Sequence, residues 1–246
     1  MKKIYNFNLD QVEEVLILKS WWAAFFVLPL ARRIILFLAN YTEISPNNIT
    51  TFSVVSRFFS ILFFVRGDYP SLVMGAVMFQ LAYLADCIDG PVARLKKIES
   101  LSGRYFDHIS DMIGDILILM ALACGQGVLL APVIIGMICL HFCEYYITYI
   151  VNMVLEKKEE ASAHISGLKE NIFVRKVLNY RGVFFSKNFK SFFSLPDYEA
   201  LTFFIFPIIG RPILGIHIGF NFLIIVVLYK VFSSFITIQT GGKKFP

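Results

Sequence analysis

Residues 86–111 read DCIDGPVARLKKIESLSGRYFDHISD, and this stretch joins two apolar segments through a short basic turn. Asp86 and Asp89 are three residues apart in the first segment, and Asp107 and Asp111 are four apart in the second. Each pair therefore shares one face of a helix. Because the connecting turn is short, the two faces can meet. The sequence predicts one pocket with four carboxylates at the end of a pair of helices.

The four carboxylates need a counter-charge, because acidic groups inside a membrane span are costly without a compensating partner. Hard divalent cations prefer oxygen ligands, and the coordination of Mg²⁺ is usually completed by substrate phosphates. Two such ions about 3.5–4 Å apart can clamp the attacking and leaving oxygens of a phosphoryl transfer. We therefore predict that Asp86, Asp89, Asp107 and Asp111 bind Mg²⁺ or Mn²⁺, as two ions, for phosphate chemistry.

Small residues and an arginine lie between the aspartates in the same stretch. Gly90, Ala93 and Gly103 would let a ligand approach the helix backbone closely. Arg94 offers a guanidinium group whose planar fork matches phosphate oxygens. A lone Asp-Gly pair usually marks a turn, but the combined pattern favours a phosphate-bearing substrate.

The composition indicates a membrane protein. The chain has 246 residues, of which 57% are hydrophobic and 17% charged, and its mean hydropathy is +0.67. A soluble domain is usually about 45–50% apolar. The net charge of +5 is not arranged as the basic-aromatic stripe of a nucleic-acid binder. We therefore expect a multi-pass membrane protein with lipids, and not nucleic acid, as partners.

Six apolar runs are predicted to span the membrane as helices. They cover residues 46–65, 71–94, 103–124, 128–155, 198–209 and 213–237. The predicted fold is thus an all-α bundle of six transmembrane helices. The predicted organisation is an N-terminal juxtamembrane segment (1–45), a transmembrane domain (46–240) with a polar-basic loop (156–197), and a short tail (241–246).

An interfacial amphipathic helix is expected before the first span. The uninterrupted apolar piece, residues 20–31, would be only about 18 Å long as a helix, which is too short to cross a bilayer. Trp21 and Trp22, followed by Arg32 and Arg33, are typical of a helix that lies at the headgroups. The alternative is an additional first span.

Charge asymmetry predicts the orientation. Basic residues are concentrated between the second and third runs and between the fourth and fifth. The connections on the opposite side carry only Arg66 and Arg211. Because basic loops stay in the cytoplasm, we expect both termini and the aspartate pocket on the cytoplasmic side.

The residues of this pattern, with every specified position present, resemble the motif of the CDP-alcohol phosphotransferases. Residues 46–50 (PNNIT) look like the start of that family's first span. The resemblance implies a six-helix membrane enzyme, usually homodimeric, whose polar cavity opens to the cytoplasm. It implies metal binding by the four aspartates and a role for Asp111 as the base that takes the acceptor's hydroxyl proton. It also implies that the CDP group is held by Gly90, Arg94, Ser100, Asn48 and Thr50.

The implied reaction is attack of an acceptor hydroxyl on a CDP-linked alcohol, with release of CMP. The usual donor would be CDP-diacylglycerol, in phospholipid biosynthesis, and the acceptor a small polyol or polyol phosphate. Another CDP-polyol, such as CDP-inositol, is an alternative donor. A cation transporter is a hypothesis of another class, but its acidic groups would lie near the bilayer midplane, and it does not account for the Gly, Ala and Arg positions.

Four further ionisable residues, Arg57, Asp115, His141 and Glu144, lie within the predicted spans. Intramembrane ionisable groups often mark a functional site. One interpretation is that they line the acceptor or lipid pocket. The other is an internal ion pair, such as Arg57 with Asp115 or with Glu144, that holds the bundle together. The sequence leaves both open.

Overall fold

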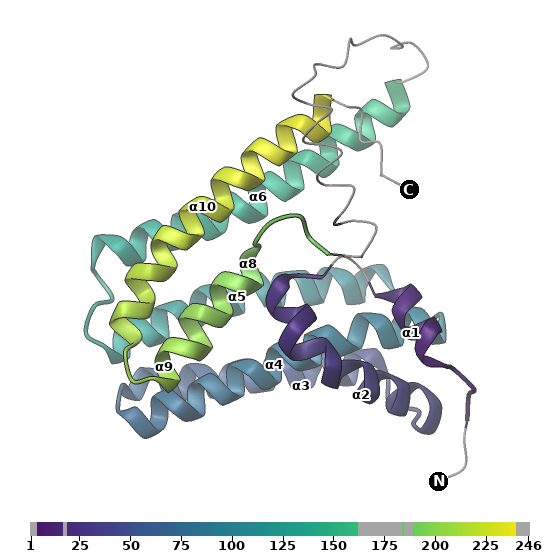
Figure 1. Cartoon of the computed structure of the whole chain (residues 1–246), viewed down its shortest axis with the longest axis horizontal. Helices are drawn as coiled ribbons and strands as arrows, with labels where there is room; N and C mark the ends of the chain where they lie inside the picture. The colour runs from purple at the N-terminus through teal and green to yellow at the C-terminus, as the bar shows by residue number, and fades with distance from the viewer. Residues whose placement is uncertain (1–3, 17–18, 162–183, 185–188, 240–246) are drawn as a thin grey trace.

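The computed structural model describes residues 4–16, 19–161, 184 and 189–239, and every regular element in these ranges is helical. Five long helices dominate Figure 1: α3 (Pro46–Arg66), α4 (Tyr69–Lys96), α5 (Leu101–Gly125), α6 (Pro132–Ala161) and α10 (Pro212–Gln239). The shorter elements are α1 (Leu9–Val15), η1 (Ala23–Val27), α2 (Leu28–Tyr41), α8 (Leu195–Glu199), η2 (Ala200–Ile205) and α9 (Phe206–Ile208). The predicted all-α class is confirmed.

Six helices in the described part of the chain are long and apolar enough to cross a membrane. They cover Ala23–Tyr41, Pro46–Arg66, Tyr69–Lys96, Leu101–Gly125, Pro132–Val151 and Pro212–Ile238. The predicted number of membrane helices is therefore confirmed, and four of the predicted runs correspond closely to α3, α4, α5 and α10. The protein is an integral, multi-pass membrane protein.

The N-terminal helix is longer than the apolar run suggested. It continues from Ala23 through Arg32 and Arg33 to Tyr41, and so it qualifies as a span by length and composition. Arg32 lies within the helix, and its Nε is 2.5 Å from Glu13 Oε1, a carboxylate supplied by α1. The length expected for this helix was thus too short, while its interfacial position stays a prediction.

The segment expected as the fifth span is shorter than a membrane crossing. It consists of α8, η2 and α9, of five, six and three residues, whereas a span needs about 20. Gly210 ends it with a left-handed backbone (φ 75°). Tyr198 and Phe203 are fully buried, so this segment packs inside the protein.

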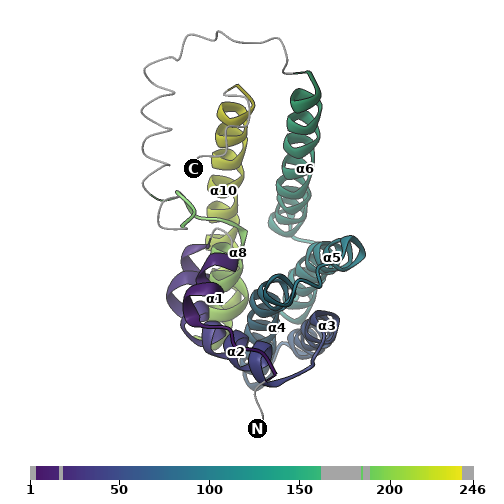
Figure 2. The same cartoon turned by 90° about the vertical axis from the view of Figure 1, so that its right-hand side faces the viewer.

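Two buried clusters join the elements. The larger is formed by side chains of α3 to α6 together with α8, η2 and α10, among them Phe64, Leu122 and Tyr198. The smaller packs α1 and α2 against α4 through residues such as Val12, Ile35 and Val92, all fully buried. In Figure 2, α1 and α2 are grouped beside α4, whereas α6 and α10 extend away from them. The end of α4 that carries Asp86 and Asp89 therefore lies under the N-terminal helices.

Helix caps define the turn between α4 and α5. Lys97 takes a left-handed conformation (φ 55°) just after α4, and its N–H donates back to the last turn of that helix. Ser100 then begins α5, with its Oγ accepting from the N–H of Gly103 at 3.0 Å. A side-chain oxygen at this position satisfies a backbone donor that the helix cannot. The chain therefore reverses within four residues, which brings the acidic faces of the two helices together.

Candidate active site at the end of α4 and the start of α5

Three of the four aspartates converge. Asp86 and Asp89 on α4 and Asp107 on α5 each offer a carboxylate oxygen, and these oxygens lie within 4.8 Å of one another. Oxygen donors at such distances suit a hard divalent cation. The structure thus unites these three residues as the sequence predicted, and their role as metal ligands stays a prediction.

Asp111 is not part of this trio and is paired with an arginine instead. Its Oδ1 accepts a hydrogen bond of 2.5 Å from Nη1 of Arg57, which reaches across from α3. Asp111 nevertheless lines the same cavity as the other three aspartates. The four carboxylates are therefore not equivalent: three are poised around one point, and the fourth is paired with a cation of the protein.

Two hydrogen bonds orient Asp89, the most buried member of the trio. Thr50 Oγ1 donates to Asp89 Oδ2 at 2.6 Å, and the N–H of Gly90 donates to Asp89 Oδ1 at 2.5 Å. Thr50, expected to contact the nucleotide, thus donates to a carboxylate of the trio. Its contact with a nucleotide stays a prediction.

The cavity in front of the aspartates has a volume of about 310 Å³. Both acidic and basic side chains line it. Gly90 is one of the lining residues. The polar side chains of the lining are Asp86, Asp89, Asp107, Asp111, Arg94, Lys19, Lys190, Ser20 and Tyr83. Acids for a metal and cations for phosphate oxygens are thus available in one space.

Arg94 is anchored to the N-terminal segment, because its Nε donates to the carbonyl of Val15 at 2.8 Å. Gly90 leaves the room for this side chain: a Cβ there would lie 3.2 Å from Arg94 Nη1. The small residue was expected to admit a ligand, and here it also admits the guanidinium group. Arg94 therefore faces the cavity in a restrained position.

The other predicted nucleotide contacts lie outside the lining of this cavity. Ser100 and Gly103 form the cap of α5, and a Cβ on Gly103 would meet Ser100 Oγ at 2.8 Å. Ala93 is buried in α4, and Asn48 is exposed at the start of α3. Their contacts with a nucleotide stay predictions.

The deeper ionisable groups have partners that the sequence did not indicate. Glu144 Oε1 lies 2.7 Å from Lys230 Nζ, and His141 Nδ1 lies 3.0 Å from the Met137 carbonyl oxygen. Arg57, for which a pair with Asp115 or Glu144 was one of two open interpretations, forms its ion pair with Asp111, and Tyr145 donates to Asp115 at 3.2 Å. Among the residues that line the aspartate cavity, none of the four predicted acceptor residues appears. Their role at the acceptor stays a prediction.

The sequence interpretation missed Lys19, Ser20 and Lys190. The N–H of Lys190 donates to the Lys19 carbonyl at 2.9 Å, which joins the segment before α8 to the segment before η1 at the cavity. Burial lowers the pKa of Lys190. Lys190 is one of eight basic residues between 157 and 190, and no local signal distinguishes it from the others. Only the contact with Lys19 places it at the site.

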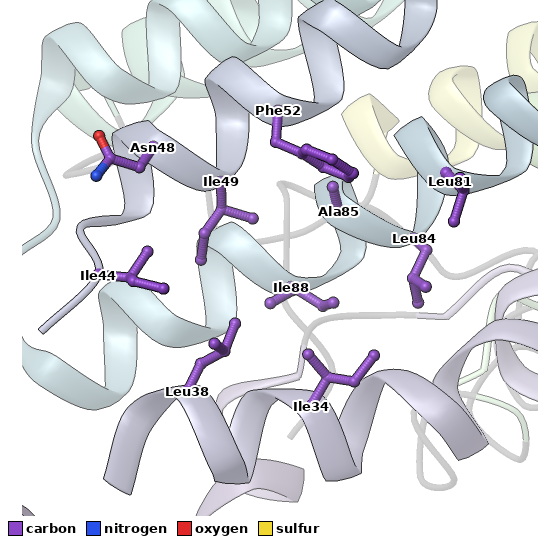
Figure 3. A pocket seen from close by; sticks show the side chains of 10 residues that line it. All are labelled: Ile34, Leu38, Ile44, Asn48, Ile49, Phe52, Leu81, Leu84, Ala85 and Ile88. Atoms are coloured by element: carbon purple, nitrogen blue, oxygen red, sulfur yellow. The ribbon is translucent and has the colours of Figure 1, made fainter. Parts of the chain in front are cut away.

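A second, apolar groove of about 400 Å³ lies on the other side of α4 (Figure 3). Ile34 and Leu38 of α2 face Ile49 of α3 and Ile88 of α4 across it. The remaining lining residues are Ile44, Asn48, Phe52, Leu81, Leu84 and Ala85. Ala85 and Ile88 directly precede Asp86 and Asp89 in the sequence. The groove and the aspartate cavity thus share one segment of α4.

Comparisons with known proteins agree with the motif. The family model for CDP-alcohol phosphatidyltransferases matches residues 43–187, more than half of the chain. The chain is also similar to the crystal structure of Mycobacterium tuberculosis phosphatidylinositol phosphate synthase (PgsA1) with CDP-DAG bound, at 16% identity and a TM-score of 0.46. That similarity covers 87% of this chain and 94% of the other. A search of curated proteins found no match.

The matched residues contain the whole motif, the four aspartates and Arg57. They extend from just before α3 to beyond α6 and so include α4 and α5, the helices that carry the four aspartates. The protein therefore belongs to the CDP-alcohol phosphatidyltransferase family and is a membrane-embedded transferase.

Proposed function

We propose that the protein transfers a phosphatidyl group from CDP-diacylglycerol to a hydroxyl acceptor and releases CMP in a divalent-metal-dependent reaction. The observation that carries this proposal is the convergence of Asp86, Asp89 and Asp107 within 4.8 Å, beside a fourth aspartate and Arg94. The family membership supports transfer chemistry, and the acidic and basic residues of the cavity lining suit a metal-bound nucleotide pyrophosphate.

The residues fit a metal. Carboxylate oxygens are the ligands that Mg²⁺ and Mn²⁺ prefer, with substrate phosphates completing the coordination. Asp86, Asp89 and Asp107 would hold the first ion, and Asp111 would contribute to a second. Bound there, the ions would neutralise the pyrophosphate and stabilise the leaving CMP.

The chain's own groups account for the remaining steps. The acceptor oxygen forms a bond to the phosphorus that carries diacylglycerol, while the bond from that phosphorus to the bridging oxygen breaks. The electron pair of the broken bond leaves with CMP. Asp111 accepts the hydroxyl proton as general base, and Arg94 binds phosphate oxygens. The products are a phospholipid and CMP, and the proton passes through Asp111 to solvent.

The apolar groove favours a lipid donor over a soluble CDP-polyol. Nine of its ten lining residues are apolar, and they include Ile88, which precedes Asp89 in the sequence. Each buried methylene of an acyl chain contributes about 0.8 kcal/mol, whereas a polyol such as inositol would gain nothing there. We therefore propose that an acyl chain of the donor occupies this groove while its headgroup reaches the aspartates.

Filling the groove should weaken binding of the lipid donor. We expect Ile34→Trp to raise the KM for long-chain CDP-diacylglycerol about tenfold, the equivalent of about 1.4 kcal/mol, or roughly two displaced methylenes. A short-chain donor should be affected much less. The measurement is CMP release at varied donor concentrations in detergent micelles. Phe58→Trp, on an exposed part of α3 outside the groove, is the control, and equal effects of both changes would remove the groove from donor binding.

Lys190 favours an acceptor that carries a phosphate over a neutral polyol. It lines the cavity, and no ion pair involves it among the residues that the structure describes. The charged groups that interact with it electrostatically are Lys230, Glu144, Asp197 and Glu199, and none of them lines the cavity. We propose that Lys190 binds the acceptor's anionic group.

Removal of this charge should separate the two kinds of acceptor. We expect Lys190→Met to raise the KM for a phosphorylated polyol about tenfold, because a hydrogen bond to a charged group contributes about 1.5–3 kcal/mol, and to leave the KM for the free polyol nearly unchanged. Arg66→Met, at the far end of α3, is the charge-matched control. A variant that discriminates between the two acceptors as the wild type does would contradict the role of Lys190.

We further propose that the site lies on the cytoplasmic side of the membrane. Arg94, Lys96, Lys97 and Arg104 surround the α4–α5 turn, and basic residues are retained in the cytoplasm. Both termini would then be cytoplasmic as well. The resemblance to the family further supports a homodimer.

The decisive test uses purified full-length protein with CDP-diacylglycerol, Mg²⁺ and a panel of polyols and polyol phosphates. Mass spectrometry should find one new phospholipid, formed in equal amount to CMP and suppressed by EDTA. Ion flux into liposomes without CMP release would instead support a transporter. The position of the aspartates argues against transport, since all four lie in the last three turns of α4 or the first three of α5.

A further inference from the structure

Arg57 is a buried cation that connects two helices of the site. It lies in the middle of α3, its side chain is only 8% exposed, and its Nη1 donates to Asp111 Oδ1 on α5. Asp86 and Asp115 also interact with it electrostatically. A buried charge of this kind requires a partner, and the partner chosen here is the proposed general base. Arg57 lies outside the motif in residues 86–111.

The backbone of α5 leaves room for this arginine. Gly114 lies three residues after Asp111 and so on the same helix face. A Cβ on Gly114 would lie 2.8 Å from Arg57 Cδ, closer than two such carbons can approach. Any larger residue at 114 would therefore displace the arginine. Arg57 and Gly114 are thus packed against each other, and the absence of a side chain on Gly114 makes room for the arginine.

The pairing separates the roles of the aspartates. Asp86, Asp89 and Asp107 turn their oxygens toward one another, whereas Asp111 is the one aspartate of the cavity that forms an ion pair among the described residues. With Oδ1 engaged by Arg57, the carboxylate of Asp111 cannot rotate freely. Its second oxygen, Oδ2, is the one left for an incoming hydroxyl group.

We propose that Arg57 is a positioning residue, which holds Asp111 so that Oδ2 receives the acceptor's proton. This inference rests on the proposed function and deepens its proton-transfer step. Arg57 is not among the residues that line the cavity, so we assign it a role through Asp111 and not a direct contact with the substrate. Correct placement of a base affects the rate of the chemical step more than substrate binding.

The competing explanation is a purely structural ion pair. Lys230 and Glu144 provide an example, because their 2.7 Å contact joins α10 to α6 outside the cavity. Loss of such a pair should lower thermal stability and leave turnover by the folded protein unchanged. Lys230→Met is therefore the matched control for Arg57→Met.

The main experiment measures kcat, KM for the donor and the thermal shift caused by CDP with Mg²⁺. For Arg57→Met we expect kcat to fall about 100-fold, in the range that general-base catalysis contributes, with KM and the CDP-induced shift retained. Arg57→Lys should recover about tenfold of that loss, since it restores the charge without the fork geometry. Lys230→Met should keep kcat within about threefold, because neither Lys230 nor Glu144 lines the cavity.

A second pair of variants moves the arginine without removing its charge. Gly114→Ala should displace Arg57 and lower kcat about tenfold, because overpacking forces neighbours out of position. Gly136→Ala, whose Cβ would meet Phe220 Cε2 at 2.9 Å on the other side of the bundle, is the control for tight packing alone. This pair keeps the test open if Arg57→Met does not fold.

A double-variant measurement completes the test. If Arg57 acts through Asp111, then Arg57→Met should cause no further loss in an Asp111→Asn background, in single-turnover CMP release. The inference is overturned if Arg57→Met or Gly114→Ala turns over like the wild type, or if the two losses are additive. Failure of the proposed function looks different, since the wild-type protein itself would then release no CMP with any acceptor.

Discussion

Asp111→Asn should reduce kcat for CMP release about a thousandfold. Asparagine has nearly the same shape, and its Oδ1 can still accept the hydrogen bond from Arg57, but it cannot take a proton from the acceptor. General-base catalysis typically contributes about 10²–10⁴-fold, and Asp111 also faces the cavity of the other aspartates. The measurement is release of radiolabelled CMP by the purified variant at saturating donor and Mg²⁺.

The same variant should remain folded and should still bind the donor. The thermal shift caused by CDP with Mg²⁺ is expected to persist, because the converging trio is intact. Asp10→Asn, an exposed change in α1, is the control for loss of one negative charge. Turnover equal to that of the wild type would remove Asp111 from the mechanism.

Asp89→Asn should abolish metal-dependent binding of CDP as well as turnover. Asp89 belongs to the trio, and both of its oxygens already accept hydrogen bonds, from Thr50 and from the N–H of Gly90. The amide of asparagine would place its own NH₂ group against either the Thr50 hydroxyl or the Gly90 N–H, both of which are donors. It would also offer one oxygen fewer to the metal. We expect kcat/KM to fall by about 10³ or more, since loss of even an orienting partner costs about 10–100-fold in metal sites.

Thr50→Val is a milder change that affects the same carboxylate. It removes the hydrogen bond that orients Asp89 but keeps the carboxylate, so a loss of about tenfold with a raised Mg²⁺ requirement is expected. Isothermal titration of Mg²⁺ and CDP into each variant measures the binding directly. If Asp89→Asn retained the Mg²⁺-dependent CDP response, the trio would not be the metal site.

Asp89 and Asp111 are thus expected to have different roles in the site. Three carboxylates are arranged around one point, and the fourth is held by Arg57 through a buried ion pair. A metal ligand that also acts as base would have to perform two tasks with one carboxylate. Because Arg57 pairs with Oδ1 of Asp111, the other oxygen, Oδ2, is the one that would serve either task.

The long helices were readily predicted from the sequence. The expected spans 46–65 and 71–94 correspond to Pro46–Arg66 and Tyr69–Lys96, because apolar composition sets their length and residues such as Ser45 and Gly67 mark their ends. The N-terminal helix and the segment before Gly210 were predicted less well. Arg32 lies inside the helix and pairs with Glu13 of α1, and an ion pair with another element is invisible to a hydropathy pattern.

The sequence by itself determined that the chain is a helical membrane protein, which family it belongs to, and which helix faces carry Asp86, Asp89, Asp107 and Asp111. Those properties depend on composition and on spacing within one helix turn. Only the tertiary structure decided that Arg57 pairs with Asp111, that Lys190 reaches the cavity, and that an apolar groove adjoins α4. These features join side chains from different helices, so they depend on how the helices pack and not on any local pattern.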